Sequence, residues 1–585
     1  MEGRSLLASQ IKSHLAFYLT AVLFLAAANV TYAFFPRVLG HFTDSLEKGG
    51  LNRETILIYS LTLALIAVVY GGCFGLGQYI NHRLGRQFEY QTRQLLFRHF
   101  ATLSESFYSR SGTGKLLSYF MNDVTTVRES IANGLNQMTN ASVLLISVIV
   151  MMSISGIPPL LIFVCLIPLL AIPVLVVRLG PRIRERSGKV QDALAAMTES
   201  AEEQFEGIKV TKTFAAEDVA RARFGSTVET IRENQLSLVR MSSLFQALLP
   251  FTGAASLALS IGFGGYLVTR GELTLGSFIA LTLYLRMIMN PLQLIGNVIN
   301  FMQRSRASLD RLNRLLGTQP DIREAEHPRM LDGRTPEIEI RNLTFTYPEA
   351  VKPSLEGVTF SLKAGETLGI IGRTGSGKTT LIKLLLRVYD PPYGTVFIGG
   401  SDIRGLSLRS LRTKVAYVPQ DGFLFSTTIR DNIAFSDRAM DLDEVEEASR
   451  LAEIHGSISE FPGRYETKLG ERGLTLSGGQ RQRTALARGL IKDAPVLLLD
   501  DSVSAVDAVT ETRILANLRK ARRGKTTIVV AHRISAVRHA ERIIVLEEGR
   551  IVESGNHESL LAAGGRYAEL LAIQEGGDRH GPDPA

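Results

Sequence analysis

The chain has 585 residues, a formal net charge of +8 and 45% hydrophobic residues, which is long enough for several domains. Its two cysteines, Cys73 and Cys165, both lie in apolar stretches, which excludes a disulfide framework and a cysteine metal site. The apolar excess lies before residue 305. We therefore expect a membrane domain followed by a soluble one.

Six stretches are nearly uncharged and long enough to span a bilayer, which predicts six membrane helices. The first could also be read as a secretory signal peptide, because Arg4 and Lys12 precede it and Thr31-Tyr32-Ala33 lies near its end. Its apolar run is longer than that of a typical signal peptide and five more spans follow, so we favour a span. The six are Leu15–Phe35, Ile56–Ile80, Gln137–Ile154, Pro159–Val177, Phe245–Val268 and Phe278–Phe301.

Positive charge is distributed unevenly between the connections. Seven Lys or Arg lie between His82 and Leu135 and eleven between Arg178 and Leu244, whereas the connections near 155–158 and 269–272 carry almost none. The two long segments are therefore expected to be cytoplasmic, together with both termini. This bias accounts for most of the net positive charge of the chain. Nucleic-acid binding is therefore the weaker explanation of that charge, and we expect no nucleic-acid partner.

The sixth predicted span contains a polar series that begins at Arg286. A charge inside a span costs at least ~2.5 kcal/mol unless it faces water or a partner. One face of this helix is therefore expected to line a cavity, and polar bonding between helices is the alternative. The other members of the series are Asn290, Gln293, Asn297 and Asn300.

Three prolines and several charges without an apolar period predict a linker at 320–336. We expect an all-α six-helix transmembrane domain over 1–319, followed by an α/β domain over 337–574, in which the motif GRTGSGKT at Gly372–Thr379 indicates a P-loop NTPase. The last residues, 575–585, are expected to be disordered.

Gly372–Thr379 reads GRTGSGKT, which is the pattern of a phosphate-binding loop. The apolar run Thr367–Ile371 predicts a buried strand before it, and Thr379–Leu386 predicts a helix after it. Glycines let backbone N–H groups converge on phosphates, and we expect Lys378 to reach the β and γ phosphates of ATP. The predicted phosphate-binding residues are Gly372, Arg373, Thr374, Gly375, Ser376, Gly377, Lys378, Thr379 and Thr380.

A second motif, which ends in an acidic residue, follows further along the chain. The apolar run Val496–Leu499 predicts a buried strand that ends in Asp500, a carboxylate placed to hold Mg²⁺. Before it, Leu476–Gln480 reads LSGGQ, which after a phosphate-binding loop resembles the signature motif of ATP-binding cassette (ABC) proteins. The resemblance implies that Ser477, Gly478, Gly479 and Gln480 bind the nucleotide of a partner cassette.

Further motifs follow in the family's order. Tyr347 resembles the ring that stacks on adenine, and Gln420 resembles the Q-loop residue that senses Mg²⁺ and touches the membrane domain. Asp507 ends a D-loop-like segment, and His532 resembles the switch histidine on the γ-phosphate. The non-functional alternatives are that Tyr347 is a ring of the hydrophobic core and that His532 is a capped histidine in a loop. Gly470–Gly473 is similar to the segment with which ABC exporters contact their membrane loops. The Mg²⁺ ligands implied are Thr379, Gln420 and Asp500.

The long cytoplasmic segments look helical, so the spans are expected to extend well beyond the bilayer. This pattern resembles the exporter-type membrane domain of ABC proteins, in which short helices at two loop tips transmit motion to the cassettes. The matching segments are Gly112–Val124 and Phe205–Glu217. An ordinary pair of solvated helices is the alternative.

Asp501 occupies the position where active ABC ATPases usually have the glutamate that polarises the attacking water. An aspartate is shorter by one methylene, and a misplacement of about 1 Å can cost on the order of 10²-fold in rate. We therefore expect this site to bind ATP well and to hydrolyse it slowly. The catalytic candidates are Asp501, His532 and Gln420.

One phosphate-binding loop and one signature motif make the chain a half-transporter that must dimerise. It resembles the subunit of heterodimeric bacterial multidrug exporters that supplies a degenerate ATP site, with a second chain carrying the catalytic glutamate. A slow homodimer is the alternative.

The expected function is ATP- and Mg²⁺-dependent export of amphipathic compounds across the bacterial plasma (inner) membrane, with the cassette and both termini cytoplasmic. A lipid flippase and an ATP-gated channel or regulatory subunit are the alternatives. Membrane lipids and an amphipathic or lipid substrate are the other expected partners.

Overall fold

The computed structural model describes residues 6–49, 52–332, 335–470, 473 and 476–578. Contacts divide the chain into two compact units. The first comprises Met1–Ala101 and Ser111–Thr318, and the second comprises Thr102–Arg110 and Gln319–Ala585. The first unit is helical, and every strand found in the described residues belongs to the second.

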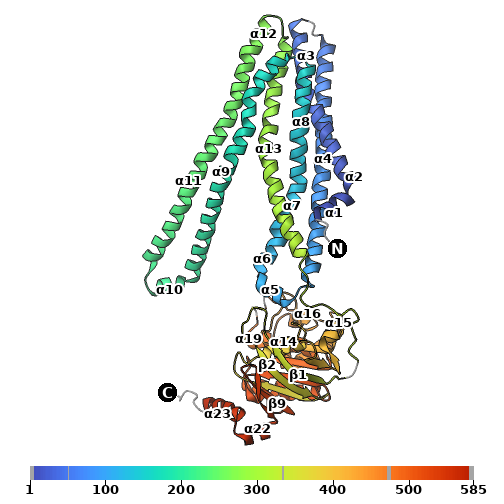
Figure 1. Cartoon of the computed structure of the whole chain (residues 1–585), viewed down its shortest axis with the longest axis vertical. Coiled ribbons are helices and arrows are strands. Elements are labelled where there is room, and N and C mark those ends of the chain that lie inside the picture. Colours follow the sequence, from blue (N-terminus) through green and yellow to red (C-terminus); the bar gives the residue numbers. More distant parts are fainter. Residues whose placement is uncertain (1–5, 50–51, 333–334, 471–472, 474–475, 579–585) are drawn as a thin grey trace. The chain divides into compact units, whose positions relative to one another are not determined.

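Long helices make up the first unit (Figure 1). Among the described residues, six helical segments are long and apolar enough to cross a membrane, which confirms the six predicted spans. Helices α4 (Arg53–Phe100) and α9 (Pro159–Glu206) have 48 residues each, far more than the roughly 20 that a bilayer needs. The spanning segments are Leu15–Glu47, Arg53–Phe100, Thr113–Ile154, Pro159–Glu206, Glu217–Thr269 and Leu275–Leu294.

The other helices of this unit are shorter or are parts of those segments. They are α1 (Leu6–Ser13), α2 (Leu15–Ala33), α3 (Phe35–Glu47), α6 (Thr113–Ser118), α7 (Val124–Glu129), α8 (Leu135–Ile154), α10 (Ile208–Thr213), α11 (Glu217–Leu259), α12 (Gly265–Thr269) and α13 (Leu275–Leu316). Single π-helical turns join α6 to α7, α7 to α8 and α11 to α12.

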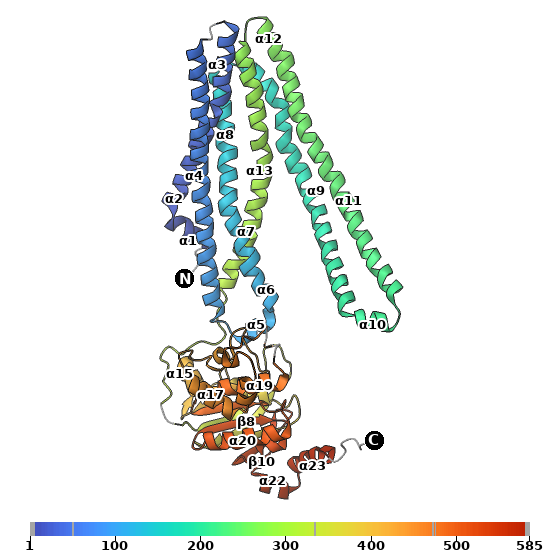
Figure 2. The same ribbon diagram turned by 180° about the vertical axis from the view of Figure 1, so that it is seen from behind.

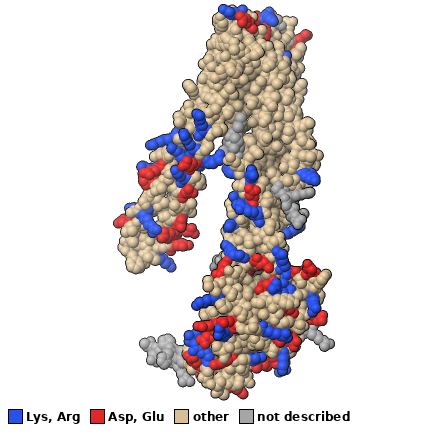
Figure 3. All heavy atoms as spheres, in the orientation of Figure 1, with Lys and Arg blue, Asp and Glu red and all other residues tan. Residues whose placement is uncertain are grey.

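The surface of this unit is apolar where that of a soluble protein would be polar. Leu23 and Val68 are 67% and 71% exposed, and Leu65 and Leu19 are nearly as open. In Figure 3 the upper parts of the helices are almost uniformly tan, and charged side chains gather on the lower parts of α9 and α11. Lipid tails solvate such side chains, and the helical backbone satisfies its own hydrogen bonds.

One predicted loop-tip helix is confirmed and the other is misplaced. Helices α9 and α11 run side by side in both views and are joined by α10, which lies inside the predicted segment Phe205–Glu217 (Figures 1 and 2). The first tip helix is α5 (Glu105–Ser111), not Gly112–Val124. Gly112, with a φ of 70°, separates α5 from the long helix that continues through α6.

Helices α3 and α13 approach closely at two glycines. A Cβ atom on Gly276 would lie 2.0 Å from the backbone oxygen of Gly40, and one on Gly40 would lie 2.6 Å from the oxygen of Gly276. Asp44 accepts hydrogen bonds from the Gly276 N–H at 2.6 Å and from the Thr274 hydroxyl at 3.0 Å. The carboxylate thus satisfies one N–H of the first turn of α13, where the N–H groups lack intrahelical partners.

A six-stranded sheet forms the centre of the second unit, in the order β10–β9–β3–β8–β7–β6. All its neighbours pair in parallel except β10 with β9. Strands buried on both faces form continuous apolar runs, and the two predicted strands are confirmed as β3 and β7. The strands are β3 (Thr367–Ile371), β6 (Val415–Val418), β7 (Val496–Asp500), β8 (Thr526–Ala531), β9 (Arg542–Glu547) and β10 (Arg550–Gly555).

A second sheet, antiparallel and in the order β2–β1–β4–β5, comprises β1 (Ile338–Phe345), β2 (Leu355–Leu362), β4 (Val396–Ile398) and β5 (Ser401–Asp402). The helices that carry the site are α14 (Lys378–Leu385), α19 (Gly478–Leu490), α20 (Ala508–Ala521), α21 (Ile534–Val537) and α23 (Arg566–Asp578). Helix α23 extends into the segment predicted to be a disordered tail, and residues 579–585 lie outside the described part. The other helices are α15 (Leu408–Lys414), α16 (Ile429–Ile433), α17 (Leu442–Leu451), α18 (His455–Ser459) and α22 (His557–Ala563).

The close approach of α3 and α13 predicts that Gly276→Ala destabilises the membrane domain. The added methyl would overlap a backbone oxygen, and such overpacking typically costs about 1–3 kcal/mol. Thermal unfolding of the purified chain in detergent should show a lower midpoint for this variant. The matched control is Gly265→Ala, where a Cβ meets nothing within 4 Å, so its midpoint should stay the same or rise slightly. Equal midpoints for the two variants would contradict the prediction.

Candidate functional site

The turn between β3 and α14 has the geometry of a phosphate-binding loop. Gly375 and Gly377 have φ values of 83° and 100°, a region that side chains disfavour. A Cβ on Gly377 would lie 2.5 Å from the Ser354 backbone oxygen, and one on Gly372 would lie 2.1 Å from the Leu546 oxygen. Glycine is therefore required at all three positions by conformation, by space, or by both.

This loop forms one wall of a pocket of about 370 Å³, a size within the usual range for small-molecule sites. The carboxyl ends of β3, β7 and β8 meet here, which is where open α/β sheets bind ligands. The lining brings together most of the predicted residues and adds Ser354, which no motif indicated. It comprises Ser354, Thr374, Gly375, Ser376, Gly377, Lys378, Thr379, Thr380, Gln420, Asp500, Asp501 and His532.

Lys378 is 6% exposed, and its ammonium donates to the backbone oxygens of Gly372 and Arg373 at 2.8 and 2.9 Å. Burial lowers the pKa of Lys378, while the nearby Asp500 and Asp501 oppose that shift. The Ser376 hydroxyl is buried without a hydrogen-bond partner among the described residues. A buried cation beside an unsatisfied hydroxyl is a suitable environment for phosphate.

Asp500 ends strand β7 and points toward Thr379. The Thr379 hydroxyl donates to Asp500 Oδ1 at 3.3 Å, and the Tyr417 hydroxyl lies 3.5 Å from Asp500 Oδ2. Burial raises the pKa of Asp500. A carboxylate and a hydroxyl next to a phosphate loop are oxygen ligands of the kind that Mg²⁺ uses, so these residues fit the ion.

Asp501 adopts a left-handed conformation, with a φ of 47°. Its N–H donates to the Val530 oxygen at 2.8 Å, and its carboxylate accepts a long hydrogen bond from the His532 N–H at 3.4 Å. The Gln482 amide donates to the Asp501 oxygen at 2.8 Å and accepts from the Ala505 N–H at 2.9 Å. The backbone of this segment is therefore fixed on both sides of the carboxylate.

Tyr347 lies next to the pocket but does not line it. Its hydroxyl donates to the Thr380 hydroxyl at 3.2 Å, and its ring packs edge-on against Phe345 and Tyr389. The ring is half-buried, so one part of it remains open to a ligand. Adenine stacking by Tyr347 stays a prediction.

The signature motif and the end of the D-loop lie outside the pocket. Ser477 caps α19 and forms reciprocal hydrogen bonds with Gln480, and Asp507 caps α20 by accepting from the Thr510 N–H at 2.9 Å. That N–H keeps the pKa of Asp507 below its usual range. Ser477, Gly478 and Asp507 are exposed, and Gly479 is half-buried.

Two further predictions fall partly outside the described residues. Within Gly470–Gly473, Glu471 and Arg472 lie outside them, as do the side chains of Asn297 and Asn300 in the polar series of the sixth span. Arg286 and Asn290 are exposed and Gln293 is half-buried. The cavity on this helix remains a hypothesis.

Comparisons with known proteins support the ABC resemblance. The family description "ABC transporter transmembrane region" matches residues 18–292, and the description "ABC transporter" matches residues 355–504. The cassette match implies that the pocket around Lys378 binds ATP.

Two curated relatives span nearly the whole chain. The "Probable multidrug resistance ABC transporter ATP-binding/permease protein YheI" of Bacillus subtilis (strain 168) is 35% identical over 96% of this chain and 96% of its own length. The "ATP-dependent lipid A-core flippase" of Syntrophus aciditrophicus (strain SB) is 33% identical over 91% of this chain and 88% of its own length.

A solved structure, that of a bacterial Atm1-family ABC exporter with ATP bound, has the same architecture. It has a TM-score of 0.80 at 27% identity, and the match covers 96% of this chain and 99% of that one. With six spans and a cassette on one polypeptide, the chain belongs to the ABC exporters that fuse a transmembrane region to a nucleotide-binding domain.

Proposed function

We propose that the chain is one half of an ATP-driven exporter of amphipathic or hydrophobic compounds. The observation that carries the proposal is a phosphate-binding pocket and six spans in a single polypeptide. The names of two relatives, YheI and the "Multidrug resistance-like ATP-binding protein MdlA" of Escherichia coli (strain K12), support multidrug-type cargo. The MdlA protein is 33% identical over 95% of this chain and 94% of its own length.

A lipid flippase is the second candidate. Its support is the lipid A-core flippase among the relatives. Drugs and lipids are both amphipathic, so one cavity could serve either. Stimulation of ATP hydrolysis by added lipid, compared with stimulation by a drug, separates the two candidates.

The membrane is the bacterial plasma membrane, with the cassette and both termini in the cytoplasm. The support is the concentration of Lys and Arg between Arg178 and Leu244 and between His82 and Leu135. A cytoplasmic cassette also has access to cellular ATP.

The working unit is a dimer. The lining of the pocket includes none of Ser477–Gln480, and the start of that segment is exposed on the same cassette. A second chain therefore supplies the signature motif that covers the γ-phosphate. Closure of the two cassettes around ATP switches the spans from inward-facing to outward-facing, and hydrolysis resets them.

The residues of the pocket that the sequence predicted have roles in this cycle. Lys378 and the N–H groups of the loop hold the β and γ phosphates. Thr379, Asp500 and Gln420 would hold Mg²⁺, which neutralises phosphate charge when it is bound. His532 contacts the γ-phosphate from the end of β8.

Asp501 makes the site on this chain a slow one, and the partner in a heterodimer carries the glutamate. The support is the short side chain and its hydrogen bond to the His532 N–H, which directs the carboxylate to the protein backbone. Removing a methylene from the usual carboxylate leaves the attacking water poorly positioned. The site mainly holds ATP, and the partner's site, completed by Ser477–Gln480, turns over.

The proposal predicts that Asp501→Glu gains ATP turnover. The wild-type chain, purified alone in lipid with Mg²⁺-ATP, should turn over no faster than the Lys378→Ala background, although it binds ATP. The longer carboxylate of Asp501→Glu should raise the rate at least tenfold, since about 1 Å of misplacement can cost on the order of 10²-fold. Steady-state phosphate release measures both rates.

The thermal unfolding midpoint of Asp501→Glu serves as a control for folding, because glutamate fits a left-handed backbone less well than aspartate. Wild-type turnover of about 1 s⁻¹ or more, the lower end of the usual enzyme range, would sink the heterodimer proposal and favour a homodimer.

The proposed cavity predicts an effect of Arg286→Ala. In the Asp501→Glu chain, the drug concentration that half-maximally stimulates ATP hydrolysis should rise about tenfold, which corresponds to about 1.4 kcal/mol of lost interaction. The matched control is Arg270→Ala, an exposed arginine at the end of another span, which should leave stimulation unchanged. Identical stimulation curves for Arg286→Ala and its parent would remove Arg286 from the cargo path.

A further inference from the structure

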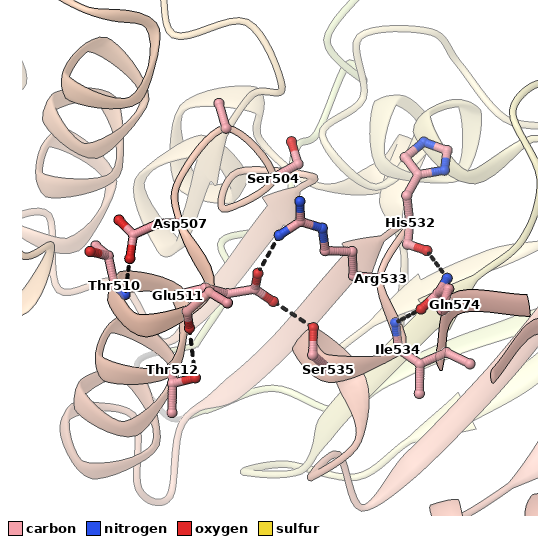
Figure 4. Close-up of polar contacts among 12 residues, drawn as sticks. Ser504, Asp507, Thr510, Glu511, Thr512, His532, Arg533, Ile534, Ser535 and Gln574 are labelled. Atoms are coloured by element: carbon pink, nitrogen blue, oxygen red, sulfur yellow. Dashed lines mark hydrogen bonds and ion pairs between the residues drawn. The ribbon is translucent and has the colours of Figure 1, made fainter. Parts of the chain in front are cut away.

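Four consecutive residues at the end of β8, His532–Ser535, are here termed the switch loop. The segment follows β8 and includes the first two residues of α21, and it is held by side chains from two helices distant in sequence (Figure 4). Neither of the two holding residues, Gln574 and Glu511, belongs to a sequence motif. Together they engage every residue of the loop through side-chain or backbone atoms.

Gln574 engages the backbone of the loop on both sides of Arg533. Its amide nitrogen donates to the His532 oxygen at 2.7 Å, and its amide oxygen accepts from the Ile534 N–H at 2.9 Å. Figure 4 shows the His532 ring on the opposite side of the backbone from Gln574. Because one planar amide makes both bonds, it fixes the direction of the peptide groups that flank Arg533.

Glu511 engages the side chains of the same loop. It is 3% exposed, and its two carboxylate oxygens accept from Arg533 at 2.9 Å and from the Ser535 hydroxyl at 2.6 Å. Glu511 lies in the first turn of α20. The residue that caps this helix is Asp507, at the end of the D-loop-like segment. Backbone and side-chain contacts therefore hold the loop independently of each other.

Helix α23, which carries Gln574, is itself anchored. Tyr567 is fully buried, and its hydroxyl lies 2.8 Å from His557 Nδ1. Arg566 pairs with Glu547 of β9 at 2.6 Å, and the Tyr567 N–H donates to Glu553 of β10 at 3.0 Å. Because α23 is fixed to the central sheet in this way, Gln574 can hold the switch loop in a defined position relative to that sheet.

We propose that Gln574 is a positioning residue for the nucleotide site, which it serves by fixing the backbone from which His532 reaches the γ-phosphate. The inference rests on the proposed function to the extent that His532 reads that phosphate. Loss of the amide frees two peptide groups, and a shift of about 1 Å at a reacting group has large effects on rate. The C-terminal helix α23 is thereby part of the ATP site.

The test compares the affinities of adenylyl imidodiphosphate, a non-hydrolysable ATP analogue, and of ADP for the full chain in lipid with Mg²⁺. The preference for the analogue over ADP measures the γ-phosphate contact without requiring turnover. Gln574→Ala should weaken analogue binding about tenfold, the typical scale for a lost hydrogen bond to a charged group, and leave ADP binding unchanged. Gln574→Glu keeps the hydrogen-bond acceptor and loses the donor, so it should also weaken binding of the analogue and leave ADP binding unchanged.

A double-mutant cycle with His532→Ala tests whether Gln574 acts through His532. If it does, His532→Ala alone should match the double variant, because the two changes remove one interaction. Ile573→Ala, an exposed neighbour on the same helix, is the matched control and should bind both nucleotides normally. Hydrogen–deuterium exchange of the switch loop should accelerate in Gln574→Ala and stay unchanged in Ile573→Ala.

Equal losses of analogue and ADP binding would show that Gln574 only stabilises the fold and would overturn the inference. Additive effects in the cycle, unchanged exchange of the loop, or no analogue preference in the wild type would overturn it as well. Failure of the proposed function has a different signature. In that case Lys378→Ala would not reduce nucleotide binding, or binding would occur without any export.

Discussion

The buried ammonium of Lys378 is the constraint on which the nucleotide site depends. A cation that is 6% exposed is costly unless negative charge lies close by. Asp500 and Asp501 supply part of that charge, and the phosphates of the ATP implied by the cassette match would supply the rest. The glycines of the loop follow from the same requirement, because Gly372 and Gly377 lie where a side chain would strike the backbone of β9 or of the segment before β2. The parallel order of β3, β8 and β7 brings the acids to the same edge as the lysine.

Local sequence motifs made most residues of the pocket predictable. The residues that the sequence did not indicate are those whose place in the site depends on tertiary contacts. The residues from Thr374 to Thr380 are contiguous and Asp500 ends an apolar run, so the sequence pattern indicated them, whereas His532 was indicated by the resemblance to ABC proteins. Gln574 lies 42 residues from His532 and Glu511 lies 22 from Arg533, and no sequence pattern links these pairs. Gly112 was interpreted as the start of the first tip helix, but it ends α5. The six spans were predictable because the bilayer fixes their length and polarity.

Two glutamines hold, in similar ways, the two segments that contribute Asp501 and His532 to the pocket. Gln482 bonds the Asp501 oxygen and the Ala505 N–H, and Gln574 bonds the His532 oxygen and the Ile534 N–H. Gln482 belongs to α19, whose first turn is the signature motif. In the proposed dimer, the helix that covers the partner's ATP is therefore bonded directly to the backbone beside this chain's own ATP. This connection offers a route by which the two sites can sense each other.

The backbone at Asp501 is held in place by bonds that do not involve its side chain. The bonds from its N–H to Val530 and from Gln482 to its oxygen fix both flanking peptide groups and hold φ at 47°. A short acidic side chain tolerates this left-handed conformation better than most residues, and here the carboxylate also accepts a long hydrogen bond from the His532 N–H. Those backbone bonds do not involve the side chain, so a change in the length of the carboxylate leaves them in place. In the proposed heterodimer, nucleotide binding and hydrolysis are thus separable at this one position, which is what two unequal ATP sites require.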